Sequence, residues 1–87
     1  MNREEELEYV KKHGLLANEG AAYADWHSYS LGATHMWSIR HGWQVANLVD
    51  ERWRNHAIEY KHFSTYRHAL TIDEAIKEVV RRQHDTI

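Results

Sequence analysis

The feature that most constrains the fold is an apolar pattern in the middle of the chain that is interrupted once. Residues 36–39 and 43–46 are mainly apolar, and the polar segment 40–42 between them ends in a glycine. Side chains of a strand alternate between two faces, and glycine is a residue that tight hairpin loops often require. The pattern therefore predicts two antiparallel strands joined by a short loop.

The register of this hairpin depends on which pairing collects the apolar side chains on one face. A three-residue loop over residues 40–42 pairs Ile39 with Trp43 and Trp37 with Val45. A two-residue loop over residues 41–42 mixes polar and apolar side chains on both faces. We therefore expect the three-residue loop, because a slip of one residue moves every side chain to the other face.

The segment 43–63 fits two structures. Its apolar residues recur at helical spacing, and neither proline nor a further glycine interrupts it, which favours a helix. Apolar and charged residues alternate over residues 58–61, which favours strands. We expect strands, so the predicted fold is α+β. It has a small antiparallel sheet of two or three strands within about residues 34–63, flanked by N-terminal and C-terminal helices. An all-α bundle is the alternative.

Both ends of the chain carry local signals for a helix. Near the N-terminus, Asn2 and Glu5 have the spacing of a capping box, and Gly14 stands where a left-handed residue closes a helix. Near the C-terminus, Thr71 and Glu74 form a second capping box. Five apolar residues at helical spacing predict the core-facing side of the C-terminal helix: Ile72, Ala75, Ile76, Val79 and Val80.

Three other segments carry weaker signals. Residues 15–32 are predicted to be helical or irregular, because Ala22, Trp26 and Tyr29 fall at helical spacing. Residues 64–70 offer the C-terminal helix an earlier start, since their apolar side chains extend the same face. Residues 83–87 are expected to fray.

Length and composition exclude several classes of protein. A chain of 87 residues has room for one core, so we expect a single small globular domain spanning residues 1–87. The absence of cysteine excludes disulfides, thiolate nucleophiles and cysteine-ligated zinc. No apolar run is long enough to span a bilayer, and no secretory signal opens the chain. We therefore expect a cytoplasmic protein with no membrane partner.

The eight histidines suggest a metal site. His56, His62 and His68 recur every six residues, and Glu59 and His62 form an E-x-x-H pattern. Di-iron sites take such patterns from two neighbouring helices, together with further glutamates. This chain has one such pattern. We expect no cofactor, and histidine-based metal binding is an alternative hypothesis.

The residue types used in catalysis lack the neighbours that catalysis requires. No serine lies in a recognisable nucleophile elbow, and the four glycines are isolated rather than grouped in a phosphate-binding loop. The adjacent acids at 50–51 and 73–74 are explained by a turn and by a helix cap. We expect no enzymatic activity and no catalytic residues.

The predicted α-β-β-β-α order resembles that of the double-stranded-RNA-binding domain. The resemblance implies RNA binding, and Arg40, Arg52, Arg54 and Lys61 of the middle segment lie among aromatic residues that can stack on bases. That family has a basic cluster at the start of its last helix, whereas residues 71–74 here are Thr-Ile-Asp-Glu. Acids at a helix N-terminus repel phosphate. Nucleic-acid binding is therefore the second hypothesis.

The aromatic side chains favour a different function. Four tryptophans and five tyrosines are more than we expect so small a core to enclose. Exposed aromatic residues beside arginine are the usual anchors of protein interfaces. We expect Trp37 and Trp43 to lie inside the protein. The predicted partner-binding residues are Trp26, Arg52, Trp53, Arg54 and Tyr60.

The favoured hypothesis is a small non-catalytic protein-binding module that inhibits or adapts a larger protein. In size and composition the chain resembles the accessory proteins that bacteriophages direct against host machinery. A homodimer would bury the same surplus of aromatic side chains, so a second copy of the chain is an alternative partner.

Overall fold

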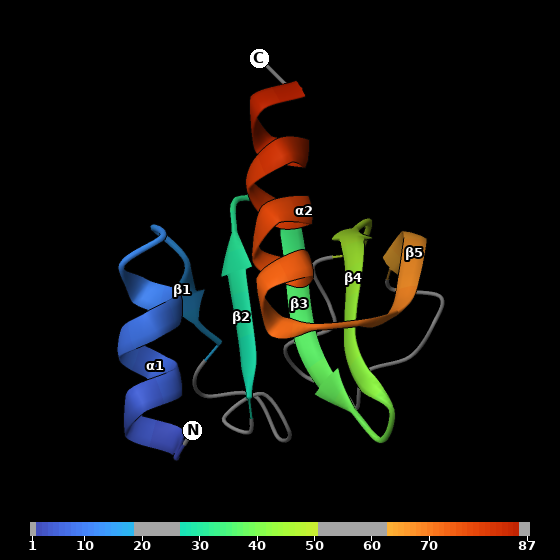
Figure 1. The fold of residues 1–87 in the computed structure, drawn as a ribbon. Coiled ribbons are helices and arrows are strands. Elements are labelled where there is room, and N and C mark those ends of the chain that lie inside the picture. Colours follow the sequence, from blue (N-terminus) through green and yellow to red (C-terminus); the bar gives the residue numbers. More distant parts are fainter. Residues whose placement is uncertain (1, 19–26, 51–62, 86–87) are drawn as a thin grey trace.

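The structure, a computed structural model, describes residues 2–18, 27–50 and 63–85. These residues form two helices and one antiparallel sheet whose five strands are neighbours in sequence order (Figure 1). The elements are α1 (Arg3–Lys11), β1 (Leu16–Ala17), β2 (Ser28–Leu31), β3 (Thr34–Ile39), β4 (Gly42–Leu48), β5 (Phe63–Leu70) and α2 (Ile72–Asp85). Neither of the helices described is long and apolar enough to cross a membrane.

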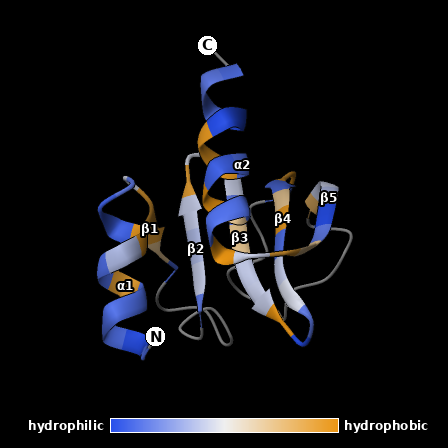
Figure 2. Ribbon diagram, in the orientation of Figure 1, coloured by the Kyte–Doolittle hydropathy of each residue, from blue (hydrophilic) through white to orange (hydrophobic). Residues whose placement is uncertain are grey.

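Helix α2 lies across one face of the sheet, and α1 packs beside β1 at the edge (Figure 1). The predicted apolar stripe of α2 is confirmed, because Ala75, Ile76 and Val79 are buried. The apolar residues of α2 form orange bands on a largely blue helix in Figure 2. Helix α1 is mostly hydrophilic and buries Glu6 and Val10.

Local capping determines where both helices begin. The side-chain oxygen of Asn2 accepts a hydrogen bond from the backbone N–H of Glu5 at 2.8 Å, which confirms the predicted N-cap of α1. At α2, the hydroxyl of Thr71 accepts from the N–H of Glu74 at 3.1 Å, and the Glu74 carboxylate accepts from the N–H of Thr71 at 3.0 Å. The hydrogen bond from the backbone N–H of Thr71 to the Glu74 carboxylate, together with the Thr71 side chain, lowers the pKa of Glu74. The second capping box is therefore confirmed in both directions.

The end of α1 agrees with the prediction, whereas the end of α2 does not. Gly14 has a φ angle of +93°, which confirms the expected left-handed residue after α1. Helix α2 continues to Asp85, so the fraying predicted for residues 83–87 is wrong for the first three of them. An ion pair of 2.7 Å between Arg81 and Asp85 spans this last turn and stabilises it.

The predicted α+β class and the helices at both ends are confirmed, and the sheet excludes the all-α alternative. The predicted sheet of two or three strands is too small: β3 and β4 lie within residues 34–63 as expected, but the described sheet has five strands. Strands β1 and β2 lie in the segment 15–32, for which the sequence predicts helical or irregular chain. Strand β5 occupies residues 63–70, which the sequence offers as an earlier start of α2.

Short length and local irregularity hide these three strands in the sequence. Strand β1 has two residues and β2 has four, which is too few to establish a two-residue period. In β5, Thr65 and Ala69 have positive φ angles of 57° and 58°, and the pairing with β4 shifts register twice. Such bulges interrupt the alternation that reveals a strand. Pairing with β4, rather than local pattern, therefore makes residues 63–70 a strand.

The predicted hairpin register is wrong by one residue. In the structure Ile39 pairs with Gly42, so the loop is only the two residues between them, and Met36 pairs with Val45. Gly42, with a φ angle of +104°, begins β4 instead of ending the loop.

Apolar packing on both faces of the sheet explains this error. On the helix side, Met36 and Val45 are fully buried at 0% exposure. On the other side, the ring of Trp37 lies 5.0 Å from that of Phe63, measured between centroids. The predicted register assumes a single apolar face, and the sheet has two. The pairing that collects apolar residues on one side is therefore not the favoured one.

Each face of the sheet carries a hydrophobic cluster. Trp43 packs against the cluster beneath the helices and Trp37 against the cluster on the opposite face, and both are half-buried, so they lie only partly inside. Trp26 and Trp53 lie outside the described residues. The buried members beneath the helices are Val10, Leu15, Tyr29, Met36, Val45, Leu70, Ala75, Ile76 and Val79; those opposite are Ala46 and Phe63.

A buried polar network joins β2 and β3 to the residue that follows β1. The side-chain amide of Asn18 donates to the hydroxyl of Ser28 at 2.7 Å and lies 3.2 Å from Nδ1 of His35. The side-chain oxygen Oδ1 of Asn18 accepts a hydrogen bond from the hydroxyl of Ser30 at 2.9 Å. These bonds replace the water that burial removes. His35, 2% exposed, is thus a structural residue of the sheet.

Candidate binding groove between the two helices

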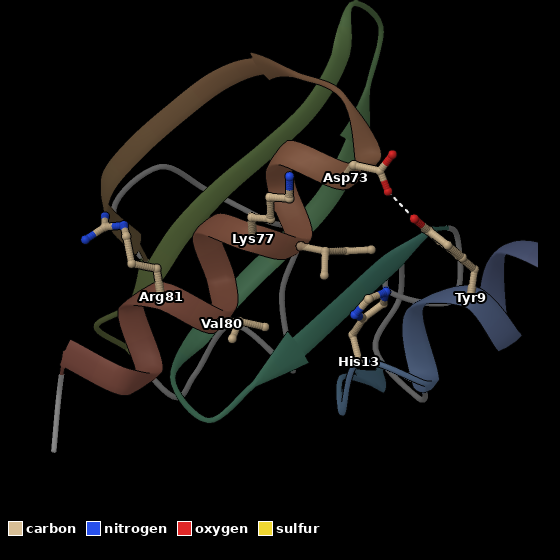
Figure 3. A pocket seen from close by; sticks show the side chains of 7 residues that line it. Tyr9, His13, Asp73, Lys77, Val80 and Arg81 are labelled. Atoms are coloured by element: carbon tan, nitrogen blue, oxygen red, sulfur yellow. Dashed lines mark hydrogen bonds between the residues drawn. The ribbon is translucent and has the colours of Figure 1, made fainter.

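A groove lies between α1 and α2 (Figure 3). Its volume is about 380 Å³, near the lower end of the range for ligand sites, about 300–1,000 Å³. Its lining residues are Tyr9 of α1, His13 of the turn after α1, and Asp73, Ile76, Lys77, Val80 and Arg81 of α2. The groove exists because two helices far apart in the sequence pack on the same sheet and face each other across a gap.

Helical periodicity explains why these residues share one surface. The lining residues of α2 stand three or four residues apart and therefore lie on one side of that helix, and His13, in the turn after α1, follows Tyr9 by four residues. The rings of Tyr9 and His13 meet edge to face with centroids 5.4 Å apart. The Nζ atom of Lys12 lies 4.7 Å from the centroid of the Tyr9 ring, within range of a cation–π interaction. The α1 wall is therefore aromatic, with a positive charge beside it.

A hydrogen bond closes one end of the groove. The hydroxyl of Tyr9 donates to the carboxylate of Asp73, in the first turn of α2 (Figure 3). This bond raises the pKa of Tyr9, and burial and the negative charge of Asp73 add to the effect. The carboxylate of Asp73 is thereby engaged with α1.

The open part of the groove has an apolar floor and a basic rim. Ile76 is 3% exposed and belongs to the core, and Val80 is half-buried beside it. His13, Lys77 and Arg81 are exposed along the rim (Figure 3). Within the described part of the chain, Lys77 makes no ion pair or hydrogen bond. Its charge is therefore available to a ligand.

A buried glutamate fixes the α2 wall. Glu78 has a side chain that is 4% exposed, and its carboxylate pairs with Arg67 of β5 at 2.8 Å, with Arg82 at 2.8 Å and with Arg81. Burial by itself would raise the pKa of Glu78, but the hydrogen bonds from Arg81, Arg82 and Arg67 outweigh it and lower the pKa to about 2. The guanidinium of Arg82 also donates to the side chain of Asn47 at 3.0 Å, which ties the helix to β4.

A second buried carboxylate fixes the α1 wall. Glu6 is 8% exposed, and its Oε2 accepts a hydrogen bond from the hydroxyl of Tyr29 and contacts Nδ1 of His27, each at 2.5 Å. Burial raises the pKa of Tyr29, and the hydrogen bond to Glu6 raises it further. From the sequence, Glu6 is simply one of three acids in the first turn of a helix. The structure shows that it anchors α1 to β2.

This anchor leads to a testable prediction. We expect Tyr29→Phe to lower the free energy of unfolding by about 2 kcal/mol, because it removes a buried hydrogen bond to a charged group. The ring and its packing against Trp43, with centroids 6.1 Å apart, are retained. Urea unfolding at neutral pH measures the change.

Tyr9→Phe is the matched control for this substitution. It also removes a phenol that donates to a carboxylate, but the bond to Asp73 is exposed to solvent. We therefore expect a much smaller loss of stability, since water replaces the lost partner. Equal losses in the two variants would contradict the view that Glu6 and Tyr29 form a buried anchor.

None of the five predicted partner-binding residues is among those that the structure describes. Trp26 falls in the gap 19–26, and Arg52, Trp53, Arg54 and Tyr60 fall in the gap 51–62. Their role in binding a partner stays a prediction.

The histidine pattern of the sequence has the same status. His56, Glu59 and His62 lie in the gap between residues 50 and 63. His68 is described, and its exposed ring stacks on that of Tyr66 with centroids 5.7 Å apart. Among the described residues, no group of three or more His, Asp or Glu side chains is placed to hold a metal ion.

The sequence shows which residues share one side of each helix, but it does not show that the two helices lie close enough to form a groove. Tyr9 and His13 stand four residues apart on a helix with a thin apolar stripe, and this spacing is visible in the sequence. Val80 also stands at the edge of the predicted stripe of α2. The distance between the two helices depends on their packing on the sheet, which the spacing does not encode. The groove is therefore a finding of the tertiary structure.

Comparison with protein-family models, curated proteins and solved structures finds no match for this chain. The functional argument therefore depends on the geometry of the groove and on the chemistry of its residues.

Proposed function

We propose that this chain is a non-catalytic protein-binding module, and that the groove between α1 and α2 receives a peptide segment of its partner. One observation carries the proposal. Half-buried Val80 and the core residue Ile76 form an apolar floor between two helices whose outer surfaces are otherwise hydrophilic (Figures 2 and 3). An apolar hollow rimmed by polar and charged side chains is the usual form of a protein-interaction site.

The composition of the groove supports a peptide side chain as the occupant. Its volume of about 380 Å³ suits one or two side chains rather than a large cofactor. Tyrosine and arginine, which are enriched among the residues that dominate binding energies, stand on opposite walls as Tyr9 and Arg81. A half-buried aliphatic surface gains free energy when a partner's side chain removes it from water.

The rigidity of the walls also supports the proposal. Glu78 joins α2 to β5 through Arg67, and Glu6 joins α1 to β2 through Tyr29. Both helices begin at satisfied caps. A groove with walls held in this way loses little conformational entropy when a peptide binds, and such preorganisation favours affinity.

Selection from a library of short random peptides tests the proposed function. Wild-type protein is expected to enrich a set of related sequences that Val80→Glu does not enrich, because a carboxylate on the floor would be buried without a partner. Arg40→Glu, in the loop between β3 and β4, is the control with altered charge away from the groove, and it should enrich the same sequences as wild type.

A second measurement separates binding at the groove from loss of folding in Val80→Glu. Addition of an enriched peptide to ¹⁵N-labelled wild-type protein should shift the amide signals of His13, Lys77 and Val80 more than those of the β3–β4 loop. Absence of any enriched sequence would contradict the proposal. Shifts confined to another surface, or to an interface between two copies of the chain, would also contradict it.

A further inference from the structure

We infer that the partner segment that occupies the groove is acidic, with a bulky aliphatic side chain on the floor and carboxylates beside it that contact the rim. This inference rests on the proposed function and adds the chemistry of the ligand. It follows from the distribution of charge along the two helices.

The two helices run in the same direction, and each has acids in its first turn and bases in its last (Figure 1). One end of the groove is closed by the hydrogen bond between Tyr9, in the last turn of α1, and Asp73, in the first turn of α2. Beyond this bond, the cationic side chains at its rim are those of Lys77 and Arg81, with Lys12 beside the Tyr9 ring. The guanidinium of Arg81 is shared with Glu78 and Asp85, so Lys77 and Lys12 are the charges most open to a ligand. The open part of the groove is therefore positive, although the chain has a net charge of −2.

The acids of α2 near the groove are engaged in bonds within the protein. Asp73 accepts from Tyr9, Glu74 caps the helix by bonding to the N–H of Thr71, and Glu78 is buried among three arginines. Lys77, by contrast, has no ion pair or hydrogen bond with any residue in the described ranges. The charge of Lys77 helps to lower the pKa of the nearby Glu74, but that carboxylate is bonded to Thr71. A carboxylate of the partner would supply the direct ion pair that Lys77 does not make with a described residue.

The same features favour a peptide over a nucleic acid. Helix α2 carries charges of both signs, with Asp73, Glu74, Glu78 and Asp85 beside Lys77, Arg81 and Arg82, so a long row of phosphates along it would meet carboxylates as well as bases. The positive groups instead surround a small hollow with an apolar floor. This arrangement suits an aliphatic side chain next to one or two carboxylates.

A peptide library with a fixed central leucine and randomised flanking residues tests the inference. Wild-type protein is expected to enrich Asp and Glu over Lys and Arg at the positions beside the leucine. Lys77→Glu should abolish this preference and weaken an enriched acidic peptide by about fivefold, the size expected for loss of an exposed charge pair. Replacing the leucine of that peptide by alanine should weaken it by about tenfold or more.

Lys11→Glu is the matched control. It makes the same charge reversal in the last turn of α1, at a residue outside the groove lining, and it should change the affinity of the acidic peptide less than about twofold. Lys11 and Lys77 are both exposed, so both variants are expected to fold. Amide shifts at His13 and Val80 confirm that the peptide occupies the groove.

The possible results distinguish this inference from the proposed function. Groove binders with basic or neutral flanks would overturn the inference and leave the proposed function standing. Equal weakening by Lys11→Glu and Lys77→Glu, or binding of a single-stranded oligonucleotide at these residues as tightly as the acidic peptide, would also overturn the inference. If no peptide from either library binds at the groove, both the inference and the proposed function fail.

Discussion

Glu78→Gln is expected to lower the free energy of unfolding by about 3 kcal/mol at neutral pH, because it removes the charge that three arginines share. Glutamine keeps the length of the side chain, so the loss measures charge rather than packing. The side chains of Arg67 and Arg81 are 54% and 59% exposed, so water partly replaces the ion pairs that they lose in the variant. The side chain of Arg82 is only 9% exposed, so water replaces its ion pair with Glu78 much less well.

The pH dependence of this effect follows from the pKa of Glu78. That pKa is about 2 in the folded protein, against an ordinary value of 4.5. The contribution of Glu78 to stability is therefore fully present above the ordinary pKa and is lost as the pH falls through the folded one. The difference in stability between wild type and Glu78→Gln should accordingly shrink between about pH 4.5 and pH 2.

Urea unfolding over this pH range checks the prediction. Glu8→Gln, at an exposed position of α1, is the control and should change stability little at any pH. A loss for Glu78→Gln that stays the same down to pH 2 would show that packing, rather than charge, explains the effect. A loss no larger than that of the control would show that the arginines do not depend on Glu78.

Gly42→Ala is expected to lower the free energy of unfolding by about 3 kcal/mol, for two reasons that add. Gly42 has a φ angle of +104°, which side chains rarely adopt. A Cβ atom at this position would also lie 2.7 Å from the backbone carbonyl oxygen of Leu70. That oxygen belongs to the paired strand β5, so it moves only if the pairing between β4 and β5 is disturbed.

Gly14→Ala separates these two reasons. Gly14 has a similar φ angle of +93°, but a Cβ atom there would meet nothing within 4 Å. We therefore expect Gly14→Ala to cost about 1 kcal/mol, from backbone strain alone. Thermal and urea unfolding of both variants measure the difference, which reports the contact with Leu70. Equal costs would contradict the close approach of β5 to the start of β4.

The parts of this fold that could be predicted from the sequence are those that depend on near neighbours. The side chains of Asn2 and Thr71 bond to N–H groups three residues on, so the helix starts can be read from four consecutive residues. Gly14 closes α1 for a similarly local reason. The amphipathic period of α2 needs only about four turns of sequence to appear.

The parts that could not be predicted depend on partners far along the chain. Residues 63–70 form a strand because β4 supplies their hydrogen bonds, and two bulges remove the alternation that would have revealed them. The register of the hairpin depends on both faces of the sheet being covered, which its own residues do not show. Glu6 and Glu78 look like ordinary surface acids of helices until the strands that supply Tyr29 and Arg67 are in place.

The sequence by itself determined the two helices, their caps and the α+β class of this protein, because bonds between residues a few positions apart are independent of the rest of the fold. Only the tertiary structure decided the number of strands, the hairpin register and the groove. Pairing of distant strands and packing of α1 and α2 on one sheet bring together side chains whose separation along the chain carries no information about their distance in space.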